Sequence, residues 1–264
     1  MATTKDSTQD SERETVVYVY GIVPGDVESD PEATGVGDPP SRVTLVRHGD
    51  LAALVSHISR DAKLGKPEDL AAHASVLDAT AGVAPVLPLR FGAVVTDEDA
   101  VAEELLANNH DDFAAALHEL EGRAQYVVKG RYDEQAILRE VLRENEEASR
   151  LREAIRGKSE DASRNERIAL GELITNALAA KREQDTGTAV ERLEALGLLV
   201  NVREATHERD AVYVSCLAEV AKQEELERAV GELAERWEGR VHMRLLGPLA
   251  PYDFVTTRQP QQQE

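Results

Sequence analysis

The sequence predicts an α+β protein of two domains: an N-terminal α+β domain over 15–121 and a C-terminal modified ferredoxin-like domain over 122–256. The chain has 264 residues, enough for two domains of ordinary size. Short β-branched runs alternate with segments whose apolar residues recur at helical spacing. In the second half the predicted order is strand, helices, strand, strand, helix, strand. This is the split βαβ order of a ferredoxin-like sandwich, with a long helical insertion at about 133–197 in its first crossover.

The N-terminal domain is predicted to begin with a buried strand at 15–23. Its sequence, TVVYVYGIV, is rich in β-branched and aromatic residues and ends at Pro24. Two further strands are predicted at 42–47 and 51–56. They flank the turn-forming residues His48, Gly49 and Asp50 and therefore predict a hairpin.

Helices complete the predicted N-terminal domain. Pro67 opens a helix that runs to Ala81, and its apolar stripe comprises Leu70, Ala74, Leu77 and Ala81. Two prolines and a glycine interrupt 84–95, which indicates an edge strand or a bent strand. Helices are predicted at 97–107 and 110–121, the second with three inward side chains, those of Phe113, Leu117 and Leu120.

The C-terminal domain is predicted to open with a strand at 123–129 and to continue as helices. Their apolar stripes comprise Ile137, Val141, Leu142, Leu151 and Ile155, then Ile168, Leu173, Ile174 and Leu178. Gly157, Lys158 and Ser159 predict a break between the two stripes. A third short helix is predicted at 189–196 and is ended by Gly197.

The remaining predicted elements close the second domain and leave two tails. Strands at 198–206 and 211–217 precede a helix at 223–237 and a strand at 240–246. The polar acidic segment 1–14 and the segment 257–264 offer nothing apolar to bury, which predicts disordered tails.

Composition excludes several classes of function. The net charge of -20 argues against nucleic acid and anionic membranes as partners, because every basic run is interrupted by acidic residues. A single cysteine, Cys216, excludes an internal disulfide and fits a reducing compartment. The start has no signal-peptide pattern, and no apolar run of about 18 residues follows. We therefore expect a cytoplasmic protein.

Catalytic and cofactor-binding patterns are missing from the sequence. The seven histidines form no metal-ligand pair with Cys216 or with one another at helical spacing. Cys216 lies in the predicted strand VYVSCLA, where a small buried residue is expected. Neither GxGxxG nor the Walker pattern occurs. We expect no cofactor, no metal and no enzymatic activity.

Four sequence blocks, distributed from Tyr18 to Val255, carry a resemblance to a known family. They are YVYGIV at 18–23; HASVL at 73–77 leading into PVLPLRFG at 85–92; YVVKG at 126–130 followed by YDE at 132–134; and RLLGPLAPYDFV at 244–255. Together and in this order, they resemble the gas vesicle protein F/L family (GvpF/GvpL). The motifs do not separate the F branch from the L branch, and the acidic segment 1–14 precedes the first of them.

The resemblance implies a non-enzymatic accessory protein of gas vesicles. Such a protein would act with the small hydrophobic vesicle wall protein and other gas vesicle accessory proteins, either as a chaperone-like factor or as a minor shell component. The resemblance also implies an N-terminal α+β domain followed by a modified ferredoxin-like domain. The alternative is a small-molecule-binding or enzymatic α+β protein that uses the ferredoxin-like sheet.

Three residues are candidates for partner binding: Arg90, Phe91 and Tyr252. Arg90 could instead pair with a carboxylate and brace the fold. Gly247 to Tyr252 predicts a rigid chain reversal that places Tyr252 and Phe254 against one of the domains. If the apolar stripe of the long helices is wider than its domain can cover, the excess could bind a hydrophobic partner in a groove or along an edge strand.

Overall fold

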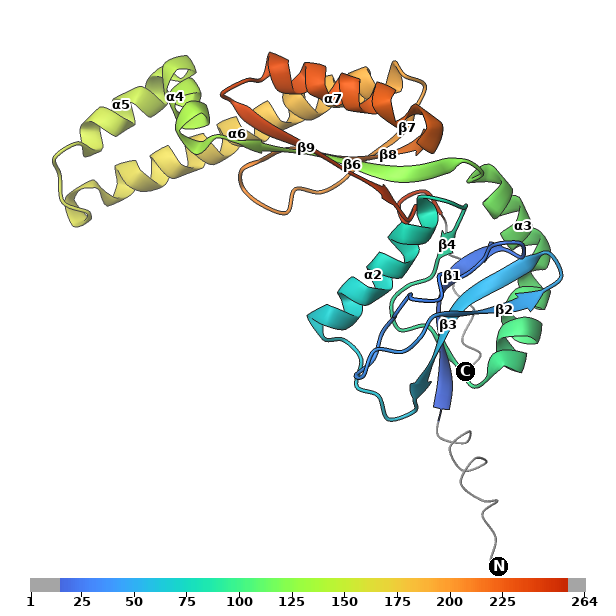
Figure 1. Cartoon of the computed structure of the whole chain (residues 1–264). Coiled ribbons are helices and arrows are strands. Elements are labelled where there is room, and N and C mark those ends of the chain that lie inside the picture. Colours follow the sequence, from blue (N-terminus) through green and yellow to red (C-terminus); the bar gives the residue numbers. More distant parts are fainter. Residues whose placement is uncertain (1–14, 256–264) are drawn as a thin grey trace, which may run out of the picture. The chain divides into compact units, whose positions relative to one another are not determined.

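The computed structural model describes residues 15–255, which combine helices with two separate sheets (Figure 1). Contacts divide the chain into two compact units. Unit 1 comprises the described residues of 1–125 and 247–264 together with 219–221, and unit 2 comprises 126–218 and 222–246. The predicted tails 1–14 and 257–264 lie outside the described residues. The predicted domains, 15–121 and 122–256, differ from these units mainly at the C-terminal segment. The prediction assigned residues 247–256 to the second domain, whereas the contacts assign the described part of this segment to unit 1.

The sheet of unit 1 is built around β1 (Thr15–Pro24), which is buried along most of its length. It pairs antiparallel with β3 (Leu51–Ser59), and β3 pairs in turn with β2 (Thr44–His48). A two-residue turn joins β2 to β3, with Gly49 at φ +60°. A glycine accepts this left-handed conformation without steric cost, which explains the predicted hairpin.

The proline-containing segment 84–95 forms two separate short strands rather than one. β4 (Leu87–Pro88) and β5 (Val94–Val95) both pair antiparallel with β1, so the prediction of an interrupted strand is confirmed. Gly21 of β1 allows this close approach. A Cβ atom there would lie 2.6 Å from the carbonyl oxygen of Leu87, so a larger residue would displace β4.

Helix α2 (Pro67–Ala81) has the predicted limits but not the predicted inner face. Leu70 is 49% exposed, so its predicted burial is wrong, whereas Leu77 and Ala81 are buried as predicted. The buried face also carries Asp69 and His73, which hydrogen-bonding partners satisfy. Asp69 accepts backbone N–H bonds from Gly37, Gly65 and Lys66, and the Gly37 bond in particular lowers the pKa of its carboxyl group.

The helical segment that follows changes its winding twice. A π-helical stretch (Ala100–Leu106) and a 3₁₀ turn (Ala107–Asn109) lead directly into α3 (His110–Glu119). The side chain of Asp97 accepts the N–H of Ala100, as its position near the predicted helix start suggested. Leu117 and Leu120 are buried as predicted, and Phe113 is half-buried.

The second sheet has the strand order β7-β8-β6-β9. These strands are β6 (Arg123–Tyr132), β7 (Leu199–Val202), β8 (Asp210–Glu219) and β9 (Val241–Leu249). Helices α6 (Arg164–Glu194) and α7 (Gln223–Arg236) lie on the same face of this sheet in Figure 1. β7 ends earlier than predicted because the N–H groups of Thr206 and His207 bind the carboxylate of Asp210 instead of continuing the ladder.

The predicted helical insertion forms an arm of three helices in unit 2. Asp133 caps α4 (Glu134–Glu144), and Asn145 caps α5 (Glu146–Ile155). α6 (Arg164–Glu194) then runs for 31 residues and includes most of the segment predicted as a separate helix at 189–196, so that prediction is wrong. Asp185, Thr186 and Gly187 are weak helix formers and favoured a break there. Tertiary contacts outweigh this preference.

A buried charged network joins the arm to the sheet. Asp185 of α6 accepts the hydroxyl of Tyr132 at 2.6 Å and pairs with Arg240 at 2.9 Å. Arg240 also binds Glu140 of α4 at 2.7 Å, and Lys181 binds the same carboxylate at 2.5 Å. Side chains from β6, α4, α6 and the residue before β9 therefore meet at one set of paired charges, which we call the Arg240 network.

Candidate partner-binding surfaces

Two of the three predicted partner-binding residues meet at His73 in unit 1. The Tyr252 hydroxyl lies 2.8 Å from His73 Nε2, and the Phe91 ring packs edge-on against the imidazole at 5.6 Å between centroids. The hydroxyl of Tyr18 lies 2.8 Å from His73 Nδ1 on the other side of the ring. The C-terminal segment thus docks on α2 through Tyr252, and Ala250 strengthens the attachment by donating its N–H to Asp78 at 2.8 Å.

Burial controls the ionisation of this cluster. It lowers the pKa of His73, and the hydrogen bond to the Leu89 carbonyl offsets only part of the effect. Burial likewise raises the pKa of Tyr18 to about 12. The imidazole and the two hydroxyls are therefore neutral at neutral pH, so the cluster is a set of uncharged hydrogen-bonding groups that hold the fold together.

Arg90 lies beside this cluster but outside the core. Its side chain is exposed, and no carboxylate within residues 15–255 pairs with it. The brace that its sequence position suggested is therefore not formed. A role for Arg90, Phe91 and Tyr252 in binding a partner stays a prediction. Of these three residues, Arg90 is exposed and Tyr252 is 40% exposed.

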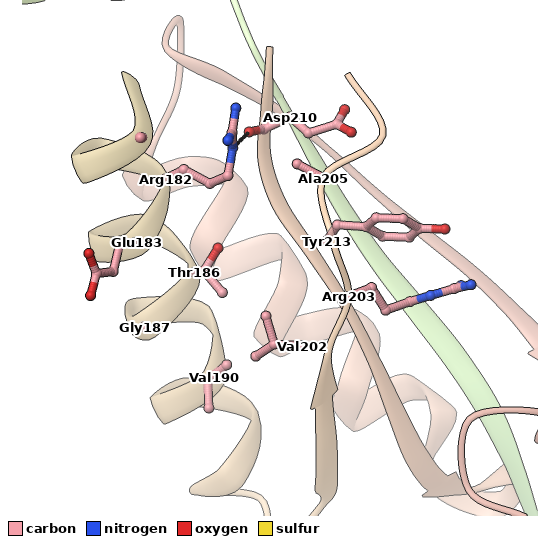
Figure 2. A pocket seen from close by; sticks show the side chains of 11 residues that line it. Arg182, Glu183, Thr186, Gly187, Val190, Val202, Arg203, Ala205, Asp210 and Tyr213 are labelled. Carbon is pink, nitrogen blue, oxygen red and sulfur yellow. Dashed lines mark hydrogen bonds between the residues drawn. The ribbon is translucent and has the colours of Figure 1, made fainter. Parts of the chain in front are cut away.

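A groove of about 500 Å³ lies in unit 2 between α6 and the β7–β8 hairpin (Figure 2). Val190 of α6 and Val202 of β7 face each other across it, and Ala179 and Ala205 add further apolar surface. Gly187 lies on the helix side, and a Cβ atom added there would meet nothing within 4 Å. The groove is therefore open, mainly apolar, and wide enough at Gly187 to accept a side chain from elsewhere.

Hydrogen bonds from α6 hold the groove in place. Arg182 donates to the carbonyl oxygens of Asp210 and Glu208 at 2.7 Å each, and Thr186 donates to Ala211. The carboxylate of Asp210 binds Thr206 and His207. Burial would raise the pKa of Asp210, but these hydrogen bonds and the nearby Lys129 ammonium lower it below its ordinary value. Two of the four charged residues that line the groove, Arg182 and Asp210, are thus engaged in holding the loop.

The outer edge of β7 borders the groove. β7 ends the strand order of its sheet, and among the described residues no strand pairs with its outer side. Leu199 is 61% exposed and Val202 is 56% exposed. An apolar strand edge next to an apolar groove can accept another strand, which would satisfy its free backbone groups.

Neither a reactive thiol nor a cluster of metal ligands is found among the described residues 15–255. Burial raises the pKa of Cys216 to about 12, which disfavours the reactive thiolate. Among residues 15–255 no three His, Cys, Asp or Glu side chains cluster as metal ligands, and no helix there is both long and apolar enough to span a membrane. The small-molecule alternative requires convergent titratable groups in a deep pocket. In the groove, Arg182 and Asp210 are occupied by structural hydrogen bonds.

Sequence reasoning missed the residues of the groove. They come from α6 and from the strand after it, and they approach one another only because α6 stays helical past Gly187. The sequence predicts a separate helix at 189–196 and a strand at 198–206, and neither prediction indicates that Gly187 and Val202 lie at one groove. The exposed apolar edge would have been detectable only from the strand order.

Comparison with known proteins places the chain beside gas vesicle proteins. Residues 16–256 match the family model described as gas vesicle synthesis protein GvpL/GvpF. Gas vesicle protein F of Streptomyces sp. (strain CB03234) is 34% identical over 245 residues, which cover 90% of this chain and 98% of that protein. Gas vesicle protein L of the same strain is 37% identical over 125 residues, covering 42% and 46% of the two chains.

Solved structures agree in fold. The crystal structure of GvpF from Anabaena sp. PCC7120 matches with a TM-score of 0.73 at 24% identity, covering 92% of this chain and 98% of that one. GvpF from Microcystis aeruginosa matches with a TM-score of 0.71 at 21% identity, covering 91% and 99%. At these identities the similarity establishes the fold alone.

Proposed function

The chain belongs to the gas vesicle synthesis protein GvpL/GvpF family, and we propose that it is a non-enzymatic accessory protein that binds the hydrophobic vesicle wall protein during assembly. The observation that carries the proposal is the match to the family model over 16–256, nearly the whole described chain. The proposal places the protein in the cytoplasm, at the gas vesicle, with other gas vesicle accessory proteins as further partners.

The groove between α6 and β7 is the surface that we propose for the wall protein. A hydrophobic protein needs apolar surface and paired backbone groups to stay soluble, and the β7 edge offers both. Complete burial of an aliphatic side chain contributes about 1.5–3 kcal/mol, so covering Leu199 and Val202 would contribute substantially to binding. The proposed mode adds one strand of the wall protein to β7 and places its side chains in the groove.

The second unit supports a further structural proposal. We infer that it is a modified ferredoxin-like sandwich whose first crossover is the arm α4–α6. Its element order, β6, helices, β7, β8, α7, β9, together with the strand order β7-β8-β6-β9, supports this assignment. The sheet then supplies a rigid support for the groove, with α6 forming one of its walls.

Co-expression with the wall protein and affinity capture test the function. The intact chain is expected to retain the wall protein at low and at moderate salt, because the proposed contact is apolar and salt does not screen it. Failure to retain it under both conditions would overturn the proposed function. In cells, disruption of the gene is expected to abolish or reduce gas vesicles, and unchanged vesicles would contradict an assembly role.

Substitutions at Gly187 test the groove. Gly187→Leu fills open space without harming the helix, since leucine is a better helix former than glycine. It is expected to reduce capture of the wall protein about tenfold. Gly187→Ala is the matched control, which gains helix propensity but leaves most of the groove open. Equal capture by both variants at the wild-type level would remove the groove from the proposal.

The strand edge has its own control pair. Leu199→Lys combined with Val202→Lys is expected to abolish capture, because it places two charges where apolar surface is proposed to be buried. Val83→Lys combined with Ile168→Lys makes the same change at residues that are also exposed but lie away from the groove. A similar loss in both double variants would show a general effect of charge rather than a site at β7.

A further inference from the structure

The sheet of unit 2 has one face that carries α6 and α7 and one that does not. Tyr132 and Tyr126 of β6 hydrogen-bond to Asp185 of α6 and Gln223 of α7, so they lie on the helix-covered face. Successive strand residues point to opposite faces, which puts Lys129 and Arg131 on the other face.

The neighbouring strands follow the same alternation. Gly130 of β6 lies on the same face as Tyr132, and the side chains of Val241 and Met243 of β9 are its nearest neighbours. Val241 and Met243 therefore lie on the helix-covered face. Arg244, the next residue of β9, lies on the opposite face with Arg131. Beside β7, the N–H of Arg203 bonds to the carbonyl of Tyr213. Figure 2 shows the side chains of Arg203 and Tyr213 pointing away from α6, although both residues also border the groove. Four basic residues from neighbouring segments thus share this surface, which we call the basic face: Lys129, Arg131, Arg203 and Arg244.

This concentration of positive charge contrasts with the composition of the chain. The protein has 50 acidic and 30 basic residues. One carboxylate next to the basic face, that of Asp210, is buried, lies 3.9 Å from Arg131 Nε and accepts hydrogen bonds from Thr206 and His207. Arg131 keeps 48% of its side chain exposed, Arg244 is exposed, and Glu204 and Glu208 belong to the connecting loop. Lys129, Arg131 and Arg244 therefore contribute positive charge to the face.

Tyr213 holds two of these cations in place. The ammonium of Lys129 lies 4.5 Å from the ring centroid, and the guanidinium of Arg203 lies 4.7 Å from it. Lys129 also donates to the hydroxyl of Thr206 at 3.3 Å. Cation–π contacts of this kind restrict long side chains before any partner arrives, which lowers the entropic cost of binding an anion.

We propose that the basic face binds an acidic segment of a partner protein in an extended conformation. Lys129 and Arg131 are two residues apart on β6, a separation of about 6.4–6.8 Å. An extended peptide with a carboxylate at every second residue has the same spacing, so its acids would pair with both cations. The cations contact the Tyr213 ring, which is therefore occupied and cannot serve as a stacking platform for nucleobases. The net charge of -20 also disfavours long polyanions.

This inference goes beyond the proposed function, because the basic face takes a partner of different chemistry from the one proposed for the groove, although Arg203 and Tyr213 also border the groove. It is tested on the full chain with a fluorescent peptide of about ten residues that alternates glutamate and threonine. Fluorescence anisotropy is expected to show binding that weakens between about 50 and 200 mM salt. A lysine–threonine peptide of the same length is expected not to bind, and binding of both peptides would overturn the proposal.

Matched charge reversals locate the site. Lys129→Glu combined with Arg131→Glu is expected to weaken peptide binding at least about tenfold. The control, Arg139→Glu combined with Arg143→Glu on exposed positions of α4, changes the net charge equally and is expected to have little effect. Equal losses in the two double variants would show that net charge rather than the basic face determines binding, which overturns the proposal.

A neutral variant and a second probe complete the test. Tyr213→Leu keeps all four cations but removes the ring that positions two of them, and it is expected to weaken binding several-fold. Trp237 fluorescence verifies that this variant is folded, because the single tryptophan is buried in unit 2. Unchanged binding in folded Tyr213→Leu would overturn the role of the ring. An oligothymidine that binds more tightly than the acidic peptide would overturn the proposal in favour of nucleic acid.

Discussion

The two units of the molecule bury polar groups in opposite ways. Unit 1 surrounds His73 with the hydroxyls of Tyr18 and Tyr252, and all three groups are neutral at neutral pH. Unit 2 largely buries the Arg240 network, in which Asp185, Glu140, Arg240 and Lys181 form ion pairs. Both networks join segments that are far apart in the sequence: Tyr252 meets His73 across 179 positions, and Arg240 meets Glu140 across 100.

The difference determines what each unit tolerates. A neutral buried network that loses one hydroxyl loses one ordinary hydrogen bond. A buried charged network that loses one partner leaves an uncompensated charge in a poorly solvated site, which costs several times more. The Arg240 network therefore holds the arm to the sheet firmly but is vulnerable, whereas the His73 cluster can lose single contacts at low cost.

Arg240→Leu is expected to produce the largest effect of the four changes considered. The substitution leaves Asp185 and Glu140 without their guanidinium partner, and it should lower the free energy of unfolding of unit 2 by about 3–5 kcal/mol. Denaturant unfolding followed by Trp237 fluorescence measures it. Arg236→Leu, at an exposed position on α7, is the control and should stay within about 0.5 kcal/mol of wild type. An equal loss of stability in Arg240→Leu and Arg236→Leu would show that the Arg240 network stabilises unit 2 no more than an exposed arginine does.

Tyr252→Phe is expected to cost much less. It removes the hydrogen bond to His73 but keeps the ring, so stability should fall by about 0.5–1.5 kcal/mol. Calorimetric unfolding measures the change. A loss as large as that of Arg240→Leu would show that the neutral cluster is no more tolerant than the charged one.

Acidification is expected to weaken unit 1 before unit 2. His73 has a folded pKa below its ordinary value of 6.5 because it is buried, so its stabilising contribution is complete above pH 6.5 and decreases as pH falls from there. For Glu140, burial raises the pKa, but the bonds from Arg240 and Lys181 lower it below 4.5 overall, so its contribution is lost only at more acidic pH.

Calorimetry at about pH 7.5 and about pH 5.5 tests this order. The hydrogen bonds of His110 to Asp50 and Asp111 raise the pKa of its imidazole, so His110 stabilises the folded protein more as the pH falls. Because this effect opposes that of His73, every sample carries His110→Gln. The transition of unit 1 should shift down at the lower pH, and His73→Gln should abolish that shift. A shift that persists in His73→Gln would assign the effect to another group.

The smallest expected effect belongs to charges that are not buried. Arg150 of α5 pairs with Glu146 and Glu147, and all three side chains are largely exposed. Arg150→Ala should change the stability of unit 2 by no more than about 0.5 kcal/mol, and the change should vanish in high salt. Trp237 fluorescence in low and high salt measures it. A loss near that of Arg240→Leu would remove burial as the cause of the difference between the networks.

The sequence predicts those elements whose causes are local. The strand at 15–23, the hairpin at Gly49 and the limits of α2 follow from β-branched runs, a left-handed glycine and Pro67. The exposure of Leu70 does not follow from such signals. Periodicity identifies an apolar stripe, but it cannot foresee that Asp69 and His73 find hydrogen-bonding partners in the core and occupy the inner face instead.

The candidate sites were harder to predict for the same reason. Phe91 and Tyr252 were singled out from their motifs, yet their meeting at His73 depends on the path of the C-terminal segment. The groove depends on α6 remaining helical through Gly187, which contacts of Asp185 and Thr186 outside the helix enforce. The basic face depends on strand order, which brings together residues separated by up to 115 positions, from Lys129 to Arg244.

The length of α6 has a consequence for local unfolding. At 31 residues the helix is about 46 Å long, but its buried residues, Asp185, Ala189 and Leu193, all lie in its last third. Its first half packs against α5 and gains little from the core. Amide protons should therefore exchange progressively more slowly from Arg164 towards Leu193, and proteases should cleave first near Gly157. The end of the arm would open as a separate cooperative unit while the sheet, the groove and the basic face stay folded.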